Sequence, residues 1–178
     1  KKRKNKRTKS KTLYKNQCLP GSKLNFAEKL LSKNNQDKAI TFISENGFRE
    51  EKNWQELNLQ VSKIVTFLQR IKIKKNDRVA AYLPNTIETV EAFLGTTSLG
   101  AIWSSCSPDF GTRGLIERFS QINPKILFIV DHYFYNGKKI NVIERAPQIL
   151  KEIKSIKYIV VVSYPGTVES NDKINPKK

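Results

Sequence analysis

Side chains that could do chemistry are concentrated in residues 104–111, which read SSCSPDFG. This segment combines hydroxyls, a thiol and a carboxylate. A catalytic Cys106 would need a nearby basic group to lower its pKa, and the single histidine of the chain is His132. Nothing in the sequence brings these two side chains together, so we expect Cys106 to be a small buried residue at the end of a strand. Asp109 is expected to cap or turn the chain before the next helix.

A second segment of interest, residues 131–139, reads DHYFYNGKK. It combines aromatic side chains, a glycine turn and two lysines. Lysine suits phosphate as a point charge, and tyrosine can lie against a nucleotide base. The two interpretations are a phosphate or nucleotide contact and a solvated basic loop. His132 is not expected to bind a metal, because no second ligand lies at a useful spacing.

The third segment, residues 83–86 (LPNT), indicates a strand stopped by Pro84 and a helix capped by Thr86. A free helix N-terminus can hold an anion, but the glycines of a dinucleotide-binding GxGxxG loop are missing. The sequence also contains no GxxxxGK[ST], GxSxG, HExxH or CxxC motif. On these patterns alone, the chain has no complete active site.

The elements that must position these three segments alternate between short apolar runs and helical patterns. This order predicts right-handed βαβ crossovers and a three-layer, doubly wound parallel sheet, an α/β fold. Ligands bind beyond the carboxyl ends of such strands, where all three segments lie. The expected strands are residues 79–83, 101–104, 125–130 and 158–162, and the expected helices are residues 86–98, 112–122 and 141–153.

A helix and a β-hairpin are expected to precede the sheet. Asn25 can cap a helix over residues 26–32, with Glu28 completing a capping box. Strands at residues 39–44 and 48–52 flank an Asn46-Gly47 turn signal. After them, apolar residues recur every three or four positions and predict an amphipathic helix over residues 54–71.

The strong positive charge of the chain raises the alternative of a nucleic-acid-binding role. The 178-residue chain carries a net charge of +17 at pH 7, and eight of the positive charges lie in residues 1–12. Residues 1–17 are therefore expected to be a disordered basic tail, and a nucleic-acid-binding protein is the alternative function. Residues 166–178 are expected to be a loose polar tail. No apolar run is long enough for a membrane span, and two distant cysteines favour a reduced, cytoplasmic setting.

Three segments carry a resemblance to a known family: residues 19–31 (LPGSKLNFAEKLL), 77–111 (DRVAAYLPNTIETVEAFLGTTSLGAIWSSCSPDFG) and 122–140 (INPKILFIVDHYFYNGKKI). They resemble the acetoacetyl-CoA synthetases, or acetoacetate–CoA ligases, of the adenylate-forming acyl-CoA synthetase superfamily. The resemblance spans roughly residues 19–165, and WSSCSPDFG is its most specific piece. Another short-chain acyl-CoA synthetase is the neighbouring alternative.

The resemblance implies a two-step ligase. ATP and acetoacetate would give an acyl-adenylate and pyrophosphate, and the thiol of coenzyme A would then displace AMP. Such chemistry rests on positioning and on charge neutralisation by Mg²⁺ and a lysine. In this family the phosphate loop, the adenosine-binding motifs and the mobile C-terminal domain follow the region present here. Residues 18–165 are therefore expected to be an incomplete N-terminal α/β subdomain that is inactive alone and binds ATP, Mg²⁺ and coenzyme A poorly.

One contact carries over by resemblance. In related acetyl-CoA synthetases an Arg-x-Gly-Arg segment after the equivalent strand contacts coenzyme A. Tyr135, Asn136, Gly137 and Lys138 stand at the similar place. Gly137 matches the glycine of that segment, and Lys138 matches its last arginine in charge. Tyr135 replaces the first arginine. Lysine lacks arginine's planar fork and would hold phosphate as a point charge. These four residues are the expected coenzyme A edge, and no catalytic or metal-binding residue is assigned.

The last expected strand, residues 158–162, would lie at a sheet edge without its family neighbours. Such an edge exposes apolar surface and unpaired backbone groups. We therefore expect the isolated chain to be marginally stable or prone to aggregation.

Overall fold

The computed structural model describes residues 23–166. The two predicted tails lie outside these residues, apart from Gly166, so their predicted disorder stays a prediction. The elements follow in this order: α1 (Phe26–Leu30), β1 (Lys38–Ile43), β2 (Arg49–Asn53), α2 (Trp54–Arg70), β3 (Arg78–Tyr82), α3 (Ile87–Ser98), β4 (Ile102–Cys106), the 3₁₀ turn η2 (Pro108–Phe110), α4 (Gly111–Ile122), β5 (Ile126–Val130), β6 (His132–Tyr135), β7 (Lys138–Asn141), the 3₁₀ turn η3 (Ile143–Arg145), α5 (Ala146–Glu152) and β8 (Tyr158–Val162).

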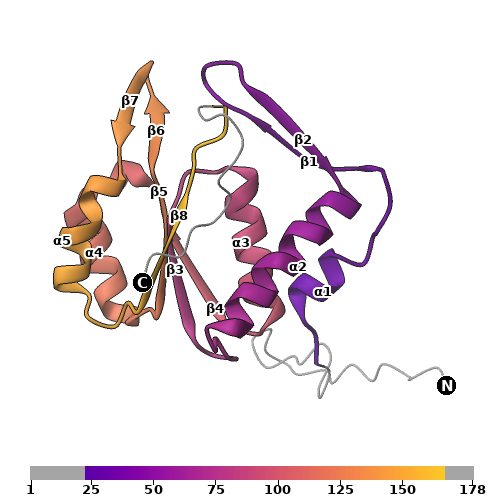
Figure 1. The fold of residues 1–178 in the computed structure, drawn as a ribbon, viewed down its shortest axis with the longest axis horizontal. Coiled ribbons are helices and arrows are strands. Elements are labelled where there is room, and N and C mark those ends of the chain that lie inside the picture. The colour runs from indigo at the N-terminus through magenta and orange to yellow at the C-terminus, as the bar shows by residue number, and fades with distance from the viewer. Residues whose placement is uncertain (1–22, 167–178) are drawn as a thin grey trace, which may run out of the picture.

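Four parallel strands form the central sheet in the order β4-β3-β5-β8. All five residues of β5 are buried, as are four of the five in β3, because both strands are covered on both faces. Helices α1, α2 and α3 lie on one side of the sheet, and α4 and α5 lie on the other (Figure 1). The predicted three-layer α/β fold is confirmed.

The strand order places a reversal between β3 and β5. The chain moves outward from β3 to β4, and then crosses back to β5 and β8 on the opposite side. Such a reversal separates the connections at the carboxyl ends of the two central strands, and leaves a crevice that ligands use. The fold thus directs attention to the segments that follow β3, β4 and β5.

Helices α2 and α3 pack closely against each other on the same side of the sheet. Asn53 and Glu56 form the complete capping box that starts α2. Gly95 on α3 makes the close approach possible, because a Cβ atom there would lie 2.6 Å from Ile64 Cγ2. A side chain at this position would therefore force the helices apart.

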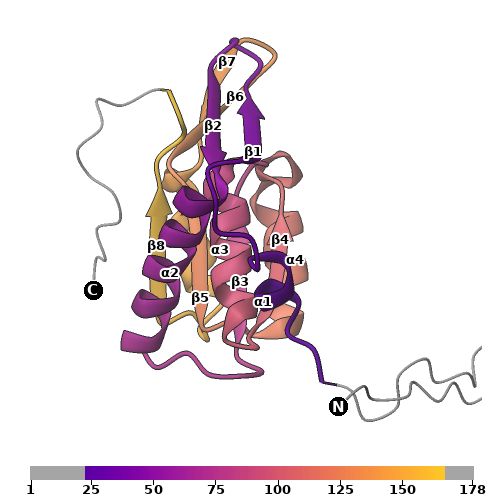
Figure 2. The same ribbon diagram turned by 90° about the vertical axis from the view of Figure 1, so that its right-hand side faces the viewer.

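Two antiparallel hairpins, β1–β2 and β6–β7, extend beyond the carboxyl ends of the sheet strands (Figures 1 and 2). The first was predicted from its Asn-Gly turn, whereas residues 131–139 were expected to be a loop. Instead, Tyr135 pairs with Lys138 around a two-residue turn at Asn136 and Gly137, which have φ of 51° and 71°. Asn-Gly accepts two positive φ values at low energy and so closes a tight hairpin.

Several predicted boundaries shift by one or two residues, and the helix predicted over residues 26–32 ends at Leu30. Strand β4 continues to Cys106, because Ser105 and Cys106 still pair with β3. The helix expected from residue 141 starts only at Ala146, since Asn141 belongs to β7 and a 3₁₀ turn follows. Among the described helices, none combines the length and apolar character needed to cross a membrane.

Candidate functional site

A cavity of about 260 Å³ lies where the three chemically interesting segments meet. Residues 83–85 enter it after β3, residues 105–107 at the end of β4, and residues 133–135 from β6. Thr89 and Asp109 complete the lining. The carboxyl-end rule therefore predicted the meeting of these segments correctly.

Tyr82 supports the wall of this cavity through the segment that follows β4. Its hydroxyl donates to the Pro108 carbonyl over 2.9 Å, and Arg145 donates to that carbonyl over 3.0 Å and also to the Tyr82 hydroxyl. Burial raises the pKa of Tyr82 against the opposing effect of the Arg145 charge, so the hydroxyl stays a donor. These contacts fix the turn between β4 and α4.

Ser107, Asp109 and Tyr133 form a polar chain along the cavity. Ser107 Oγ donates to Asp109 Oδ2 over 2.7 Å, and the Tyr133 hydroxyl donates to Asp109 Oδ1 over 2.8 Å. Burial, together with the hydrogen bond and charge of Asp109, raises the pKa of Tyr133 to about 12. Asp109 is a turn residue as expected, but the cap of the turn is the side chain of Ser107.

Cys106 is buried, as the sequence predicted. Its Sγ lies 3.7 Å from the Ser107 carbonyl. Burial raises the pKa of the thiol by more than the charge of Arg118 lowers it. The reactive thiolate is therefore disfavoured, and Cys106 has the character of a packing residue.

His132 contacts an acidic side chain and two aromatic rings, and no contact with Cys106 is found among the described residues. Its Nδ1 lies 3.0 Å from Asp131 Oδ1, and its ring packs against Phe134 and Tyr164 with centroid distances of 5.8 Å. Its buried Nε2 makes no hydrogen bond within residues 23–166. In this part of the chain, no cluster of three or more acidic, histidine or cysteine side chains could hold a metal ion.

The four residues of the expected coenzyme A edge are all exposed on the β6–β7 hairpin. Tyr135 lines the cavity, while Asn136 and Gly137 form the tip and Lys138 begins β7. The backbone N–H groups of Asn136 and Gly137 each donate over 3.0 Å to the carboxylate of Glu45, on the turn of β1–β2. Sequence reasoning missed Glu45, because a glutamate beside an Asn-Gly turn looks like an ordinary surface residue.

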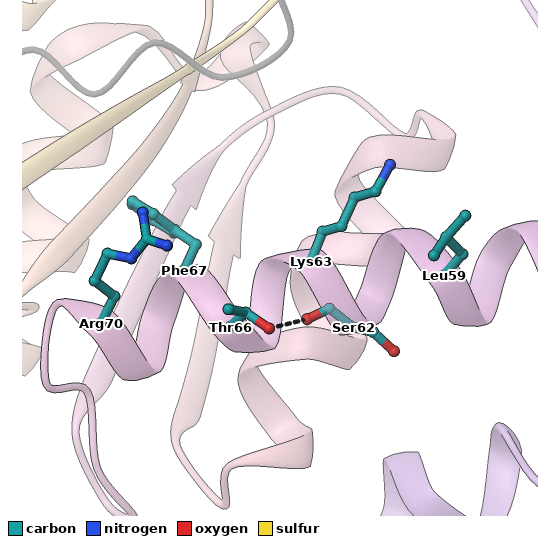
Figure 3. A pocket seen from close by; sticks show the side chains of 6 residues that line it. All are labelled: Leu59, Ser62, Lys63, Thr66, Phe67 and Arg70. Atoms are coloured by element: carbon teal, nitrogen blue, oxygen red, sulfur yellow. Dashed lines mark hydrogen bonds between the residues drawn. The ribbon is translucent and has the colours of Figure 1, made fainter.

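A second hollow, of about 320 Å³, lies along α2 (Figure 3). All its lining side chains come from this one helix. The Thr66 hydroxyl donates to the Ser62 carbonyl over 2.9 Å and so has its partner within the helix. With no polar groups converging from other elements, this surface is a weaker candidate than the cavity at the strand ends.

A family model described as "AMP-binding enzyme" matches residues 28–178 of the chain. The chain belongs to this family. It is 41% identical over 160 residues to an acetoacetyl-CoA synthetase of Macaca fascicularis, covering 89% of this chain and 23% of that protein. It is 42% identical over 147 residues to an acetoacetyl-coenzyme A synthetase of Rhizobium meliloti (strain 1021), covering 83% of this chain and 22% of that protein.

A solved structure of acetoacetyl-CoA synthetase from Streptomyces lividans superimposes with a TM-score of 0.79 and 32% identity. The match covers 88% of this chain and 25% of that one. The chain thus spans about a quarter of the length of the proteins it matches. Within residues 23–166 it offers a cavity braced by Tyr82 and lined by Tyr133, whose pKa is raised, and an exposed basic hairpin, which suit binding better than covalent chemistry.

Proposed function

We propose that this chain supplies the first α/β layers, residues 18–165, of an acetoacetate–CoA ligase. The whole enzyme would use ATP and Mg²⁺ to convert acetoacetate to an acyl-adenylate, and would then transfer the acyl group to coenzyme A. The observation that carries this proposal is the identity of 41% to 42% with acetoacetyl-CoA synthetases over more than four fifths of the chain.

The contribution of this chain would be an edge of the coenzyme A site at Tyr135, Asn136, Gly137 and Lys138. Tyr135 can lie against a base, and Lys138 can neutralise a phosphate. Lys138 and Lys139 make no ion pair within residues 23–166, so their charges are available to a ligand. Tyr135 also connects this hairpin to the cavity at the strand ends.

The test uses the full-length enzyme that contains this chain. Acetoacetate should support coenzyme A-dependent AMP formation better than acetate does. In Lys138→Ala, the KM for coenzyme A should rise about tenfold, because one phosphate contact is worth about 1.4 kcal/mol. Acetoacetate-dependent exchange of pyrophosphate into ATP should be unchanged.

Lys139→Ala is the matched control. Lys139 is the next residue on β7 and pairs with Phe134 instead of Tyr135, so its side chain points to the opposite face of the hairpin. Equal effects of the two substitutions would count against a specific edge at Lys138. The 178-residue chain alone should release no pyrophosphate in response to acetoacetate, and such release would refute its proposed inactivity.

A further inference from the structure

The tip of the β6–β7 hairpin already binds an anionic group in this structure. Glu45 Oε2 accepts from Asn136 N and Glu45 Oε1 accepts from Gly137 N, each over 3.0 Å. Both carboxylate oxygens are used by two consecutive backbone amides, 91 and 92 residues away in the sequence. Consecutive N–H groups that converge on one side of a turn form a common anion-binding arrangement.

Glu45 is not needed to build its own turn. The β1–β2 turn is closed by Ser44 N donating to the Phe48 carbonyl and by Gly47 N donating to the Ser44 carbonyl. The Asn46 side chain accepts a further hydrogen bond from Phe48 N. The carboxylate of Glu45 can therefore leave the opposite hairpin without undoing the hairpin that carries it.

The two hairpins are also held together below this contact. Tyr164, just after β8, packs against Phe42 of β1 at 6.3 Å and against Phe134 of β6 at 5.8 Å between ring centroids. The two tips would thus stay near each other when the Glu45 contact opens. Exposed Lys138 flanks the turn and favours an anion with more charge than a carboxylate.

We infer that Glu45 is an internal competitor that occupies a phosphate-binding turn formed by the Asn136 and Gly137 amides. A phosphate group takes the place of the carboxylate and receives the same two N–H groups, with Lys138 beside it. The inference rests on the proposed coenzyme A edge for the source of that phosphate, but the competition itself concerns any phosphate group. Glu45 then sets the fraction of molecules in which the turn is free to bind the ligand. It therefore lowers the apparent affinity of the turn for phosphate.

The experiment follows the amide signals of Asn136 and Gly137 by ¹H–¹⁵N NMR on the whole 178-residue chain, with inorganic phosphate as the probe. Glu45→Gln removes the charge, and Glu45→Ala removes the acceptor. Both should bind phosphate at these amides at least about fivefold more tightly than the unmodified chain, because the competing population is removed. Equal affinities in all three proteins, or no movement of these two signals, would overturn the inference.

Glu117→Gln is the matched control, because Glu117 is an exposed carboxylate paired with Arg113 on α4. It should bind phosphate as the unmodified chain does, and an increase equal to that of Glu45→Gln would show a general charge effect and overturn the inference. Coenzyme A serves as a second probe. If phosphate shows the expected ranking and coenzyme A moves neither amide, the competition stands and the proposed coenzyme A edge fails. If coenzyme A moves both amides equally in all variants, the edge stands and the role of Glu45 fails.

Discussion

The two hairpins are fastened differently at their bases and at their tips. At the base of β1–β2, Lys52 Nζ lies 2.7 Å from Glu91 Oε1, with side chains 17% and 6% exposed. At the base of β6–β7, the buried Tyr133 donates to Asp109. The tips meet only through the exposed carboxylate of Glu45 among the described hydrogen bonds. Buried contacts are expensive to leave unmade, whereas exposed ones exchange with water, so the bases maintain the fold and the tips can respond to a ligand.

The contact at the base of β1–β2 has an excess of negative charge. Burial lowers the pKa of Lys52, but the hydrogen bond that Lys52 donates to Glu91 and the charges of Glu91, Glu50 and Glu88 outweigh burial and raise it. Burial raises the pKa of Glu91 by more than Lys52 lowers it, and the nearby acids add to the rise. Both pKa values are therefore raised, as expected where three carboxylates surround one ammonium group.

Removal of the ammonium group should give the largest effect. Lys52→Met leaves the buried Glu91 without its partner, and breaking such a pair from one side costs about 3 kcal/mol of unfolding free energy. Urea denaturation at neutral pH measures this loss. Lys38→Met is the control in the same hairpin, because Lys38 also pairs with a glutamate but is 58% exposed. It should cost under about 1 kcal/mol, and a loss equal to that of Lys52→Met would remove the distinction between buried and exposed contacts.

The base of the second hairpin should show an intermediate effect. Tyr133→Phe deletes the hydroxyl that donates to Asp109, and a hydrogen bond to a charged acceptor contributes about 1.5 kcal/mol. Tyr135→Phe, two residues along the same strand, alters a side chain that is 60% exposed and should change stability by less than about 0.5 kcal/mol. Thermal unfolding compares the two. An equal Tm for both variants would mean that the Asp109 contact does not hold the hairpin.

The pH dependence of stability separates burial from pairing at Glu91. Its pKa in the folded chain lies above the ordinary value of 4.5, chiefly because it is buried. Folding therefore favours the protonated form, and this contribution is complete below 4.5 and is lost as the pH rises through the folded pKa. Relative to Glu91→Gln, which does not titrate, the unmodified chain should lose stability as the pH rises from 4.5 through the raised folded pKa of Glu91. A relative gain over this range would show that the Lys52 charge outweighs burial.

The sheet was predictable because its signals are local. Continuous apolar runs such as ILFIV, stopped by proline, glycine or charged residues, mark strands buried on both faces. The short connections then restrict the order of elements to parallel crossovers. Helix α2 was equally predictable, since Asn53 and Glu56 carry a capping signature in the sequence itself.

The hairpin tips were predicted less well, for two different reasons. The Asn136-Gly137 turn signal is as strong as that of Asn46-Gly47, but the aromatic and basic residues around it favoured a binding loop. The turn signal on its own indicates the hairpin of β6 and β7. The contact of Glu45 with this turn joins residues 91 positions apart and has no local signal, so only the folded chain reveals it.

The smallest stability effect is expected at the tips, and it decides whether they differ from the bases. Glu45→Gln should lower the unfolding free energy by less than about 1 kcal/mol, because the contact is exposed and the freed N–H groups bind water instead. Hydrogen exchange at Asn136 and Gly137 should nevertheless become faster, since the carboxylate no longer protects these amides. A loss as large as that of Lys52→Met would make Glu45 a structural clamp. Such a clamp could not yield to a phosphate group without unfolding the hairpin, so small cost and fast exchange together are what a displaceable contact requires.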